Sequence, residues 1–297
     1  MESIVSYPDR GTYGNSRYRG NCSGRLIEDL IDQYKVRQLS DFMVGGGTTQ
    51  DVCKARGIPG HFTDLRLGYD MLSMDIPERS ESIFFHPAYH NIIRYADNMY
   101  SAKDVMEKYG IDANAEDLSQ CASYEEFLQK LNYCVEKQFA SLEKGGRLFM
   151  LVGDIKKSGR LYSMACDILK PNLEQIIIKA QHNCTSDRKV YTNCNFVPIV
   201  HEYLIVCKKD GGRYFTANIG ERVRKDTLAS KAPSWRDVII ALLEDAGKES
   251  SLEELYAEMQ DSPKTASNPH WKEKIRQTVQ NTRYFTRTAR GTYALAS

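Results

Sequence analysis

Runs typical of β-strands alternate with runs typical of α-helices over about 200 residues, and this alternation limits the possible folds more than any other feature. The strand-like runs are short and apolar, and they cover residues 39–44, 60–65, 82–86, 147–154, 174–180 and 201–209. The helical runs cover residues 24–35, 50–57, 124–146 and about 160–170. This order predicts an α/β fold with a doubly wound, mostly parallel sheet. The last two strands are expected to form an antiparallel edge.

Composition agrees with an ordinary globular protein. The chain has 297 residues, of which 41% are hydrophobic and 27% charged, enough for a large domain and a small one. No apolar run approaches the roughly 18 residues of a membrane span, and the N-terminus lacks the zones of a signal peptide, so a cytoplasmic location is expected. The eight scattered cysteines suit reduced thiols.

A metal site is not expected. The best cluster of ligand-type side chains lacks a close pair of cysteines; it consists of His182, Cys184, Cys194, His201 and Cys207.

Basic residues concentrate at the C-terminus, although the net charge of the whole chain is only +1. Residues 264–297 contain seven Lys or Arg residues and one acid, Glu273. Three amphipathic segments and a hairpin in residues 233–297 are similar to a winged helix, joined by a linker (216–232) to a catalytic domain (1–215). The expected nucleic-acid contacts on its third helix and hairpin are Lys272, Lys274, Arg276, Gln277, Arg287 and Arg290.

The segment before residue 24 is rich in Arg, Tyr and Gly and offers little to a core. One interpretation is a mobile arm that orders over a cofactor or over nucleic acid, because aromatic and Arg side chains suit both. The other is a surface loop that clamps the catalytic domain.

A glycine turn carries the first chemical signal. The strand at 39–44 opens into Gly45–Gly47 and then into a helix, an arrangement that lets a ligand approach the backbone and face a helix N-terminus. No Lys follows the glycines, so this is not a phosphate-binding Walker loop. Asp64, at the end of the next strand, can accept hydrogen bonds from ribose hydroxyls. The alternatives are a simple tight turn and a helix-capping Asp.

The motif order resembles the S-adenosyl-L-methionine (AdoMet)-dependent DNA amino-methyltransferases over roughly residues 15–210. The resemblance rests on "DFMVGGGTT", "TDL", "GYDML", "FFHPAYHN", "GGRLFMLVGDI" and "VPIVHEYLIV". The glycine segment is similar to that of the beta class, but here it precedes the catalytic tetrapeptide. The resemblance implies AdoMet as cofactor, held by Asn21, Ser23, Asp41, Gly45, Gly47, Asp64 and Asp70. Ser23 is alternatively only a helix cap.

The segment "HPAY" occupies the place of the family's catalytic tetrapeptide, which is Asp, Asn or Ser, then Pro-Pro, then Tyr or Phe. The resemblance gives hydrogen-bond acceptance to His86 and to the Pro87 carbonyl, and stacking on a flipped-out base to Tyr89. His86 and Ala88 depart from the pattern. Only a neutral imidazole can accept a hydrogen bond, so activity is expected to fall below about pH 6.5 unless the pocket shifts the pKa of His86.

The implied substrate is double-stranded DNA, with the N6 amino group of adenine preferred. Cytosine N4 is the nearest alternative, followed by a guanine amino group in RNA and by a DNA-binding regulator without activity. A cognate restriction or defence component is a candidate partner.

Overall fold

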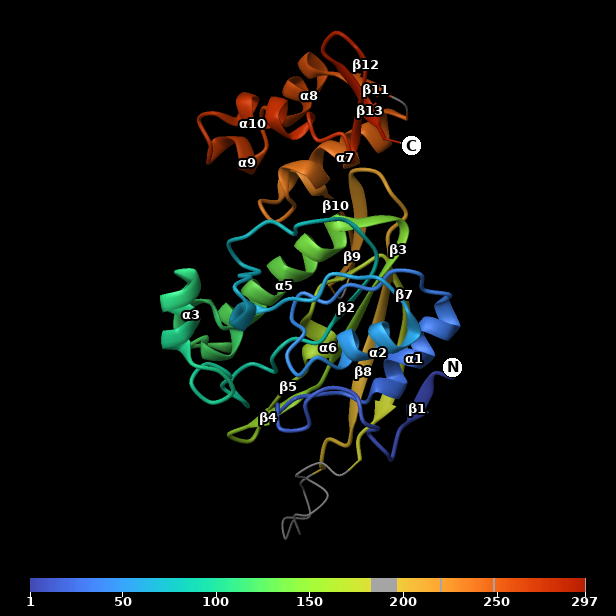
Figure 1. The fold of residues 1–297 in the computed structure, drawn as a ribbon, viewed down its shortest axis with the longest axis vertical. Helices are drawn as coiled ribbons and strands as arrows, with labels where there is room; N and C mark the ends of the chain where they lie inside the picture. The colour runs from blue at the N-terminus through green and yellow to red at the C-terminus, as the bar shows by residue number, and fades with distance from the viewer. Residues whose placement is uncertain (183–196, 220, 248, 297) are drawn as a thin grey trace.

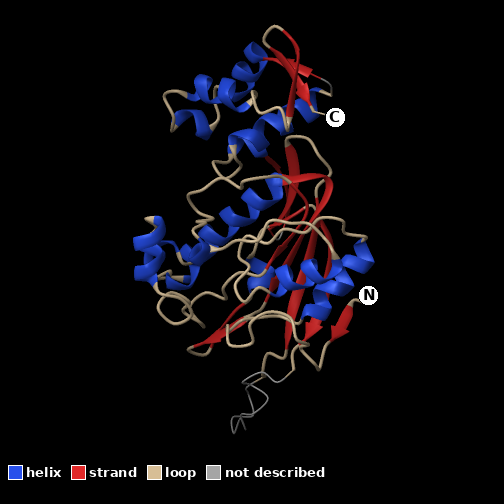
Figure 2. Cartoon of the chain, viewed as in Figure 1, coloured by secondary structure: helices blue, strands red, loops and turns tan. Residues whose placement is uncertain are grey.

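A computed structural model describes residues 1–182, 197–219, 221–247 and 249–296 (Figures 1 and 2). Its central sheet has the strand order β1-β7-β8-β3-β2. The bounds of these strands are β1 Ile4–Ser6, β2 Ser80–Phe85, β3 Leu142–Val152, β7 Leu173–Ala180 and β8 His201–Lys208. Two further short segments extend the sheet beyond β2 through parallel bridges, which join Ser40 to Ile83 and Asp41 to Phe62.

The sheet is mostly parallel, as predicted. β2 pairs with β3 and β1 pairs with β7 in parallel, whereas β8 runs antiparallel to both of its neighbours, β3 and β7. The antiparallel pairing of the last two strands is confirmed, but their place at the edge is wrong. β8 lies inside the sheet, and the short strand β1 covers the outer side of β7.

Helices cover both faces of the sheet, which makes it doubly wound (Figure 1). Alternating strand residues face opposite layers, because successive side chains of a strand point to opposite sides. Ile83 and Phe85 pack with α5 (Tyr124–Ser141) and α6 (Met164–Asp167). Phe84 packs on the other face with α1 (Gly24–Tyr34) and α2 (Thr48–Arg56).

Shorter elements complete the main body. They are η1 Leu65–Leu67, α3 Ala102–Tyr109, α4 Ala113–Glu116, η2 Leu118–Gln120, β4 Ile155–Lys157, β5 Arg160–Tyr162 and β6 Lys170–Pro171. The expected strands at 39–44 and 60–65 shrink to isolated bridges. The helix expected over 124–146 ends at Ser141, because the chain enters β3 at once. The helix expected over about 160–170 is a single turn, α6.

Residues 216–232, expected to be a linker, are largely regular structure. β9 (Tyr214–Ile219) pairs antiparallel with β10 (Glu221–Asp226) and with β6, and a 3-10 turn, η4 (Thr227–Ala229), follows. Backbone pairing with β6 of the main body explains why this polar segment forms regular structure. The division of the chain into two domains stays a prediction.

The C-terminal segment forms a unit with its own core, at the top of Figure 1. Its elements are α7 Trp235–Ala246, β11 Glu249–Ser251, α8 Leu252–Met259, α9 Pro263–Ala266, α10 Trp271–Thr278, β12 Phe285–Ala289 and β13 Thr292–Leu295. Arg283 pairs with Glu78 of the main body at 2.6 Å, and the Tyr284 hydroxyl accepts a hydrogen bond from the backbone N–H of Arg79. These contacts tie the unit to the segment before β2.

No helix within the described residues is long and apolar enough to cross a membrane. Six cysteines in the same part of the chain have free thiols, and no cluster of metal-binding side chains occurs among the described positions. Cys184 and Cys194 lie outside them.

Candidate functional site

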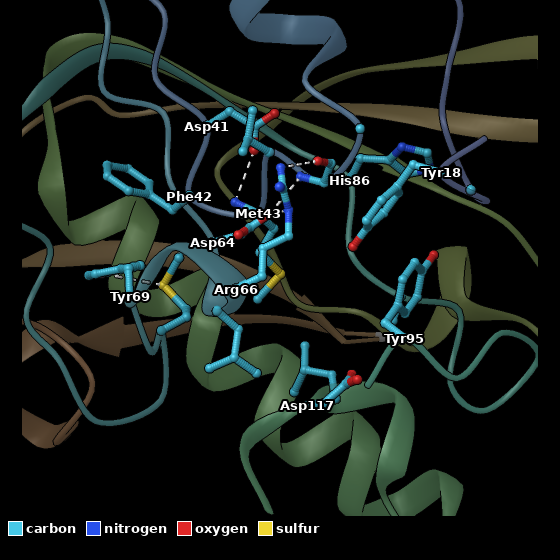
Figure 3. Close-up of a pocket in the computed structure, with 18 of the residues that line it drawn as sticks. Tyr18, Asp41, Phe42, Met43, Asp64, Arg66, Tyr69, His86, Tyr95 and Asp117 are labelled. Carbon is cyan, nitrogen blue, oxygen red and sulfur yellow. Dashed lines mark hydrogen bonds and ion pairs between the residues drawn. The ribbon is translucent and has the colours of Figure 1, made fainter. Parts of the chain in front are cut away.

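A pocket opens where the two bridge segments and β2 end (Figure 3). These three segments are parallel neighbours, so their carboxyl ends meet at one edge of the sheet, where ligands bind in open α/β folds. The space is about 900 Å³, including the part open to solvent.

The glycine turn forms one wall of the pocket. Gly45 and Gly47 have φ angles of 47° and 84°, a left-handed conformation that favours glycine. A Cβ on Gly46 would lie 2.7 Å from Asn21 Nδ2, so this position also excludes a side chain. Gly47 precedes α2 without a side-chain cap, which leaves N–H groups of the first helical turn open to a ligand.

Asp64 joins the glycine turn to the next segment of the pocket. Its Oδ2 accepts hydrogen bonds from the Gly45 N–H and from Arg66 Nε, both at 3.1 Å, and its Oδ1 accepts one from the Leu67 N–H. Arg66 also donates to the Gly45 carbonyl at 2.7 Å, so its guanidinium lies across the pocket (Figure 3). Burial raises the pKa of Asp64 against the opposing effect of Arg66.

Two more acids are buried at the pocket. Asp41 accepts a hydrogen bond from the Met43 N–H at 3.0 Å, and burial raises the pKa of Asp41 to about 7. Asp70 is 3% exposed and accepts a hydrogen bond from the Leu72 N–H at 2.9 Å. Both side chains hold loops that line the pocket.

Aromatic side chains close the side of the pocket opposite Asp41 (Figure 3). Tyr18 stacks on Tyr95 with ring centroids 5.6 Å apart and planes inclined by 25°. Tyr18 belongs to the N-terminal segment, which is held against the glycine turn by a hydrogen bond from the Asn15 N–H to the Gly46 carbonyl. This contact favours the clamp among the two interpretations of the segment.

His86 follows β2 and lines the pocket. Its Nε2 lies 3.1 Å from the Tyr89 hydroxyl, which donates to Glu202 Oε1 at 2.7 Å. Glu202 Oε2 in turn accepts from Lys179 Nζ at 2.7 Å. Burial lowers the pKa of His86 to about 4, even though the Glu202 carboxylate acts in the opposite direction.

This shift corrects the expected pH dependence. A lowered pKa keeps the imidazole neutral, and able to accept a hydrogen bond, at every pH well above about 4. We therefore expect no loss of activity from His86 between pH 8 and 5.5, and a loss only as pH approaches 4. Initial rates at saturating concentrations across this range measure it. A fall centred near pH 6.5 that is absent in His86→Asn would mean that burial does not lower the pKa of His86.

Six of the ten predicted catalytic and cofactor residues line the pocket: Asn21, Asp41, Gly45, Asp64, Asp70 and His86. Gly47 lies just behind the turn at the start of α2. Ser23 neither lines the pocket nor caps its helix, since its hydroxyl donates to the Arg10 carbonyl at 3.2 Å. Pro87 is buried and does not line the pocket.

Tyr89 does not line the pocket, in contrast to its expected stacking role. Its hydroxyl is bound between His86 and Glu202, and its ring packs so closely on Gly153 that a Cβ there would lie 2.6 Å from Cε2. Other aromatic residues line the pocket, namely Tyr18, Phe42, Tyr69, Phe84, Tyr95 and Tyr100.

Sequence reasoning missed Arg66, Tyr18, Tyr95 and Glu202. A signal existed for Arg66, which directly follows the quoted "TDL" and lies two positions after Asp64. Glu202 stood inside the quoted "HEYLIV" strand, where a carboxylate in an apolar run indicates a buried partner.

The predicted nucleic-acid-binding residues lie on the surface of the C-terminal unit. Lys272, Arg276, Gln277, Arg287 and Arg290 are exposed and Lys274 is half-buried. Arg276 pairs with Glu273 at 2.6 Å within α10, which reduces its free charge. α10 begins at Trp271 rather than at Pro269, because the Asn268 side chain caps the preceding turn by accepting from the His270 N–H.

Comparisons with known proteins give remote similarities. No protein-family model and no curated protein sequence matches the chain. A candidate DNA modification methylase from Thermus thermophilus is 19% identical, with a TM-score of 0.28 over 60% of this chain and 54% of that one. The chain thus spans about half the length of that protein.

Two other solved structures are methyltransferases. A SAM-dependent methyltransferase from Archaeoglobus fulgidus is 10% identical, with a TM-score of 0.32 over 65% of this chain and 96% of that one. The 1,6-didemethyltoxoflavin-N1-methyltransferase of Burkholderia thailandensis, solved with S-adenosylhomocysteine, is 12% identical, with a TM-score of 0.32 over 63% of this chain and 77% of that one. These values are too low to establish a shared fold or activity, so function has to be argued from the pocket.

Proposed function

We propose that this chain is an AdoMet-dependent methyltransferase that acts on an exocyclic amino group of DNA, with adenine N6 the preferred target. One observation carries the proposal. A single pocket brings together the glycine turn, Asp64, Asp70 and His86, which the motif resemblance had assigned to cofactor binding and catalysis. These residues are separated in sequence, and only the parallel sheet brings them to one edge.

The pocket residues fit the chemistry of AdoMet. The uncapped N-terminus of α2 suits the carboxylate of its methionine part, because free N–H groups and the helix dipole both favour an anion. Asp64 is the acid for the ribose hydroxyls. A carboxylate has about four acceptor positions, and three of those of Asp64 are already filled by donors of the chain. One position is left for a ribose hydroxyl, so binding the second hydroxyl requires Arg66 to move away. Asp70, which lines the same pocket, is the residue proposed to accept from the adenine amino group.

Catalysis then needs orientation of the target amino group. AdoMet would supply the methyl group and leave as S-adenosylhomocysteine, while the methylated amino group would lose one proton to solvent. His86, which remains neutral, accepts a hydrogen bond from the amino group and so directs its lone pair away from the imidazole. Tyr18 and Tyr95 offer the aromatic surfaces that an extruded base needs, since Tyr89 is bound elsewhere.

The C-terminal unit is proposed to be a winged helix that binds duplex DNA. Its order of one helix, a short strand, further helices and a hairpin supports this, as do the exposed basic side chains of α10 and the hairpin. A cognate restriction component stays a prediction from the motif resemblance.

We expect Lys272→Ala combined with Arg287→Ala to weaken DNA binding and to lower the salt dependence of log K by about one for each phosphate that is no longer neutralised. Lys103→Ala removes an exposed lysine of the main body, which pairs with Glu107, and serves as the control. Fluorescence anisotropy with a labelled duplex at several salt concentrations measures both. An unchanged slope in the double variant would remove this surface from the interface.

The direct test incubates the protein with labelled AdoMet and mixed genomic DNA, followed by nucleoside digestion and mass spectrometry. N6-methyladenine supports the preferred target, and N4-methylcytosine keeps the mechanism with another base. Label on RNA alone moves the substrate to RNA. A protein that does not bind AdoMet by calorimetry is not a methyltransferase, and the DNA-binding regulator then becomes the better interpretation.

A further inference from the structure

A chain of hydrogen bonds connects His86 to a buried ion pair deep in the sheet. It runs from Lys179 on β7 to Glu202 on β8, then to Tyr89 and to His86 in the loop after β2, with distances of 2.7, 2.7 and 3.1 Å. Lys179 and Glu202 are 8% and 6% exposed. Burying an ion pair costs free energy that burying hydrophobic side chains at the same positions would not cost. A buried ion pair next to a pocket residue therefore suggests a function other than stability.

The direction of each hydrogen bond follows from the chemistry of the groups. Burial alone would raise the pKa of Glu202, but the Lys179 charge and the hydrogen bonds from Lys179 and Tyr89 hold that pKa below its ordinary value. Glu202 is therefore a carboxylate and can only accept. Burial and the Glu202 charge raise the pKa of Tyr89, so its hydroxyl keeps its proton and donates it to Glu202.

The Tyr89 hydroxyl then has no proton left for His86 and can only accept from Nε2. A neutral imidazole carries one N–H, so that hydrogen sits on Nε2 and Nδ1 holds a lone pair. Nδ1 has no hydrogen-bond partner in the described part of the chain. It is also not a buried atom, because it is absent from the buried polar atoms that lack a partner there. It is thus free to bind a donor in the pocket.

We infer that Lys179, Glu202 and Tyr89 fix the tautomer of His86, so that Nδ1 presents a lone pair to the amino group of the substrate. The role of Nδ1 toward a substrate rests on the proposed function. Tyr89 is then a positioning residue rather than a base-stacking one. Hydrogen-bond acceptance by a histidine depends on its tautomer, whereas acceptance by an ionised Asp does not. A neutral imidazole has one acceptor nitrogen, and the other tautomer would point an N–H at the donating amino group.

The experiment compares the full-length protein with its Tyr89→Phe variant. Phenylalanine keeps the ring against Gly153 but removes the hydroxyl, so Nε2–H loses its acceptor and both tautomers become available. Tyr34→Phe is the matched control, since Tyr34 is half-buried against Phe149 and its hydroxyl has no hydrogen-bond partner in the described residues.

Two measurements are made. NMR of protein labelled with ¹⁵N-histidine distinguishes the tautomers, with the His86 signals assigned by their absence in His86→Asn. We expect the Nε2–H form alone in the wild type and in Tyr34→Phe, and a mixture in Tyr89→Phe. We also expect kcat of Tyr89→Phe to fall in proportion to the share of the Nδ1–H tautomer, by about twofold for an equal mixture, with KM for AdoMet unchanged, because that tautomer cannot serve the reaction.

An Nδ1–H form in the wild type, or an unchanged tautomer in Tyr89→Phe, overturns the inference. So does a Tyr89→Phe variant with wild-type kcat. The NMR result does not require turnover, so a wild-type protein that methylates no nucleic acid would refute the proposed function while the tautomer is still decided.

Discussion

Replacing His86 with alanine is expected to lower kcat for methyl transfer by about 100-fold or more, with little change in the affinity for AdoMet. We propose that the His86 imidazole, which lines the pocket, orients the target nitrogen, and one hydrogen bond that acts in the transition state contributes roughly 10²–10³-fold to rates. Single-turnover rates at saturating DNA and AdoMet measure the chemical step, and calorimetry measures the affinity for AdoMet.

His86→Asn is the informative companion to this variant. A carboxamide oxygen is an acceptor of similar reach, and Asn is one of the residues that the resembled family uses at this position. We expect it to recover part of the rate lost in His86→Ala. If the alanine variant retained near wild-type kcat, or if both variants were equally inactive while still folded, hydrogen-bond acceptance by His86 would not be its role.

The fold could be predicted well because its signal is local. Apolar strand runs such as Ile83–Phe85 and amphipathic helices such as α1 show their periodicity within a few residues. The position of β8 inside the sheet could not be predicted, because strand order depends on pairing between distant segments. The strands expected at 39–44 and 60–65 are mostly irregular, since their residues serve loops of the pocket rather than a ladder.

For the candidate site, too, local motifs could be predicted and contacts between distant segments could not. Asp64 and the glycine turn are part of short motifs, so their place at one pocket could be predicted from neighbouring residues. Tyr89 was assigned to stacking from its motif, but its hydroxyl binds Glu202, which lies 113 positions further along the chain. Tyr18 likewise reaches Tyr95 from a segment that has no periodic pattern. Contacts between distant segments decide which motif residues face the ligand.

Asp64→Asn is expected to weaken AdoMet binding by about 10- to 100-fold. Hydrogen bonds to a charged group contribute roughly 1.5–3 kcal/mol, and each 1.4 kcal/mol corresponds to about tenfold in affinity. The substitution removes the charge at almost constant volume. An amide nitrogen in place of Oδ2 would also face two donors, the Gly45 N–H and Arg66 Nε, which now share that oxygen. Calorimetry with AdoMet measures the change.

The control for this variant is Asp9→Asn, which also removes one carboxylate charge. Asp9 pairs with Arg25 at 3.3 Å, but its side chain is 71% exposed, and exposed ion pairs contribute little. Its AdoMet affinity should equal that of the wild type. Because Asp64 also supports the glycine turn, thermal unfolding separates a weakened ligand interaction from a disrupted fold. A folded Asp64→Asn protein that binds AdoMet as tightly as the wild type would exclude Asp64 from the cofactor site.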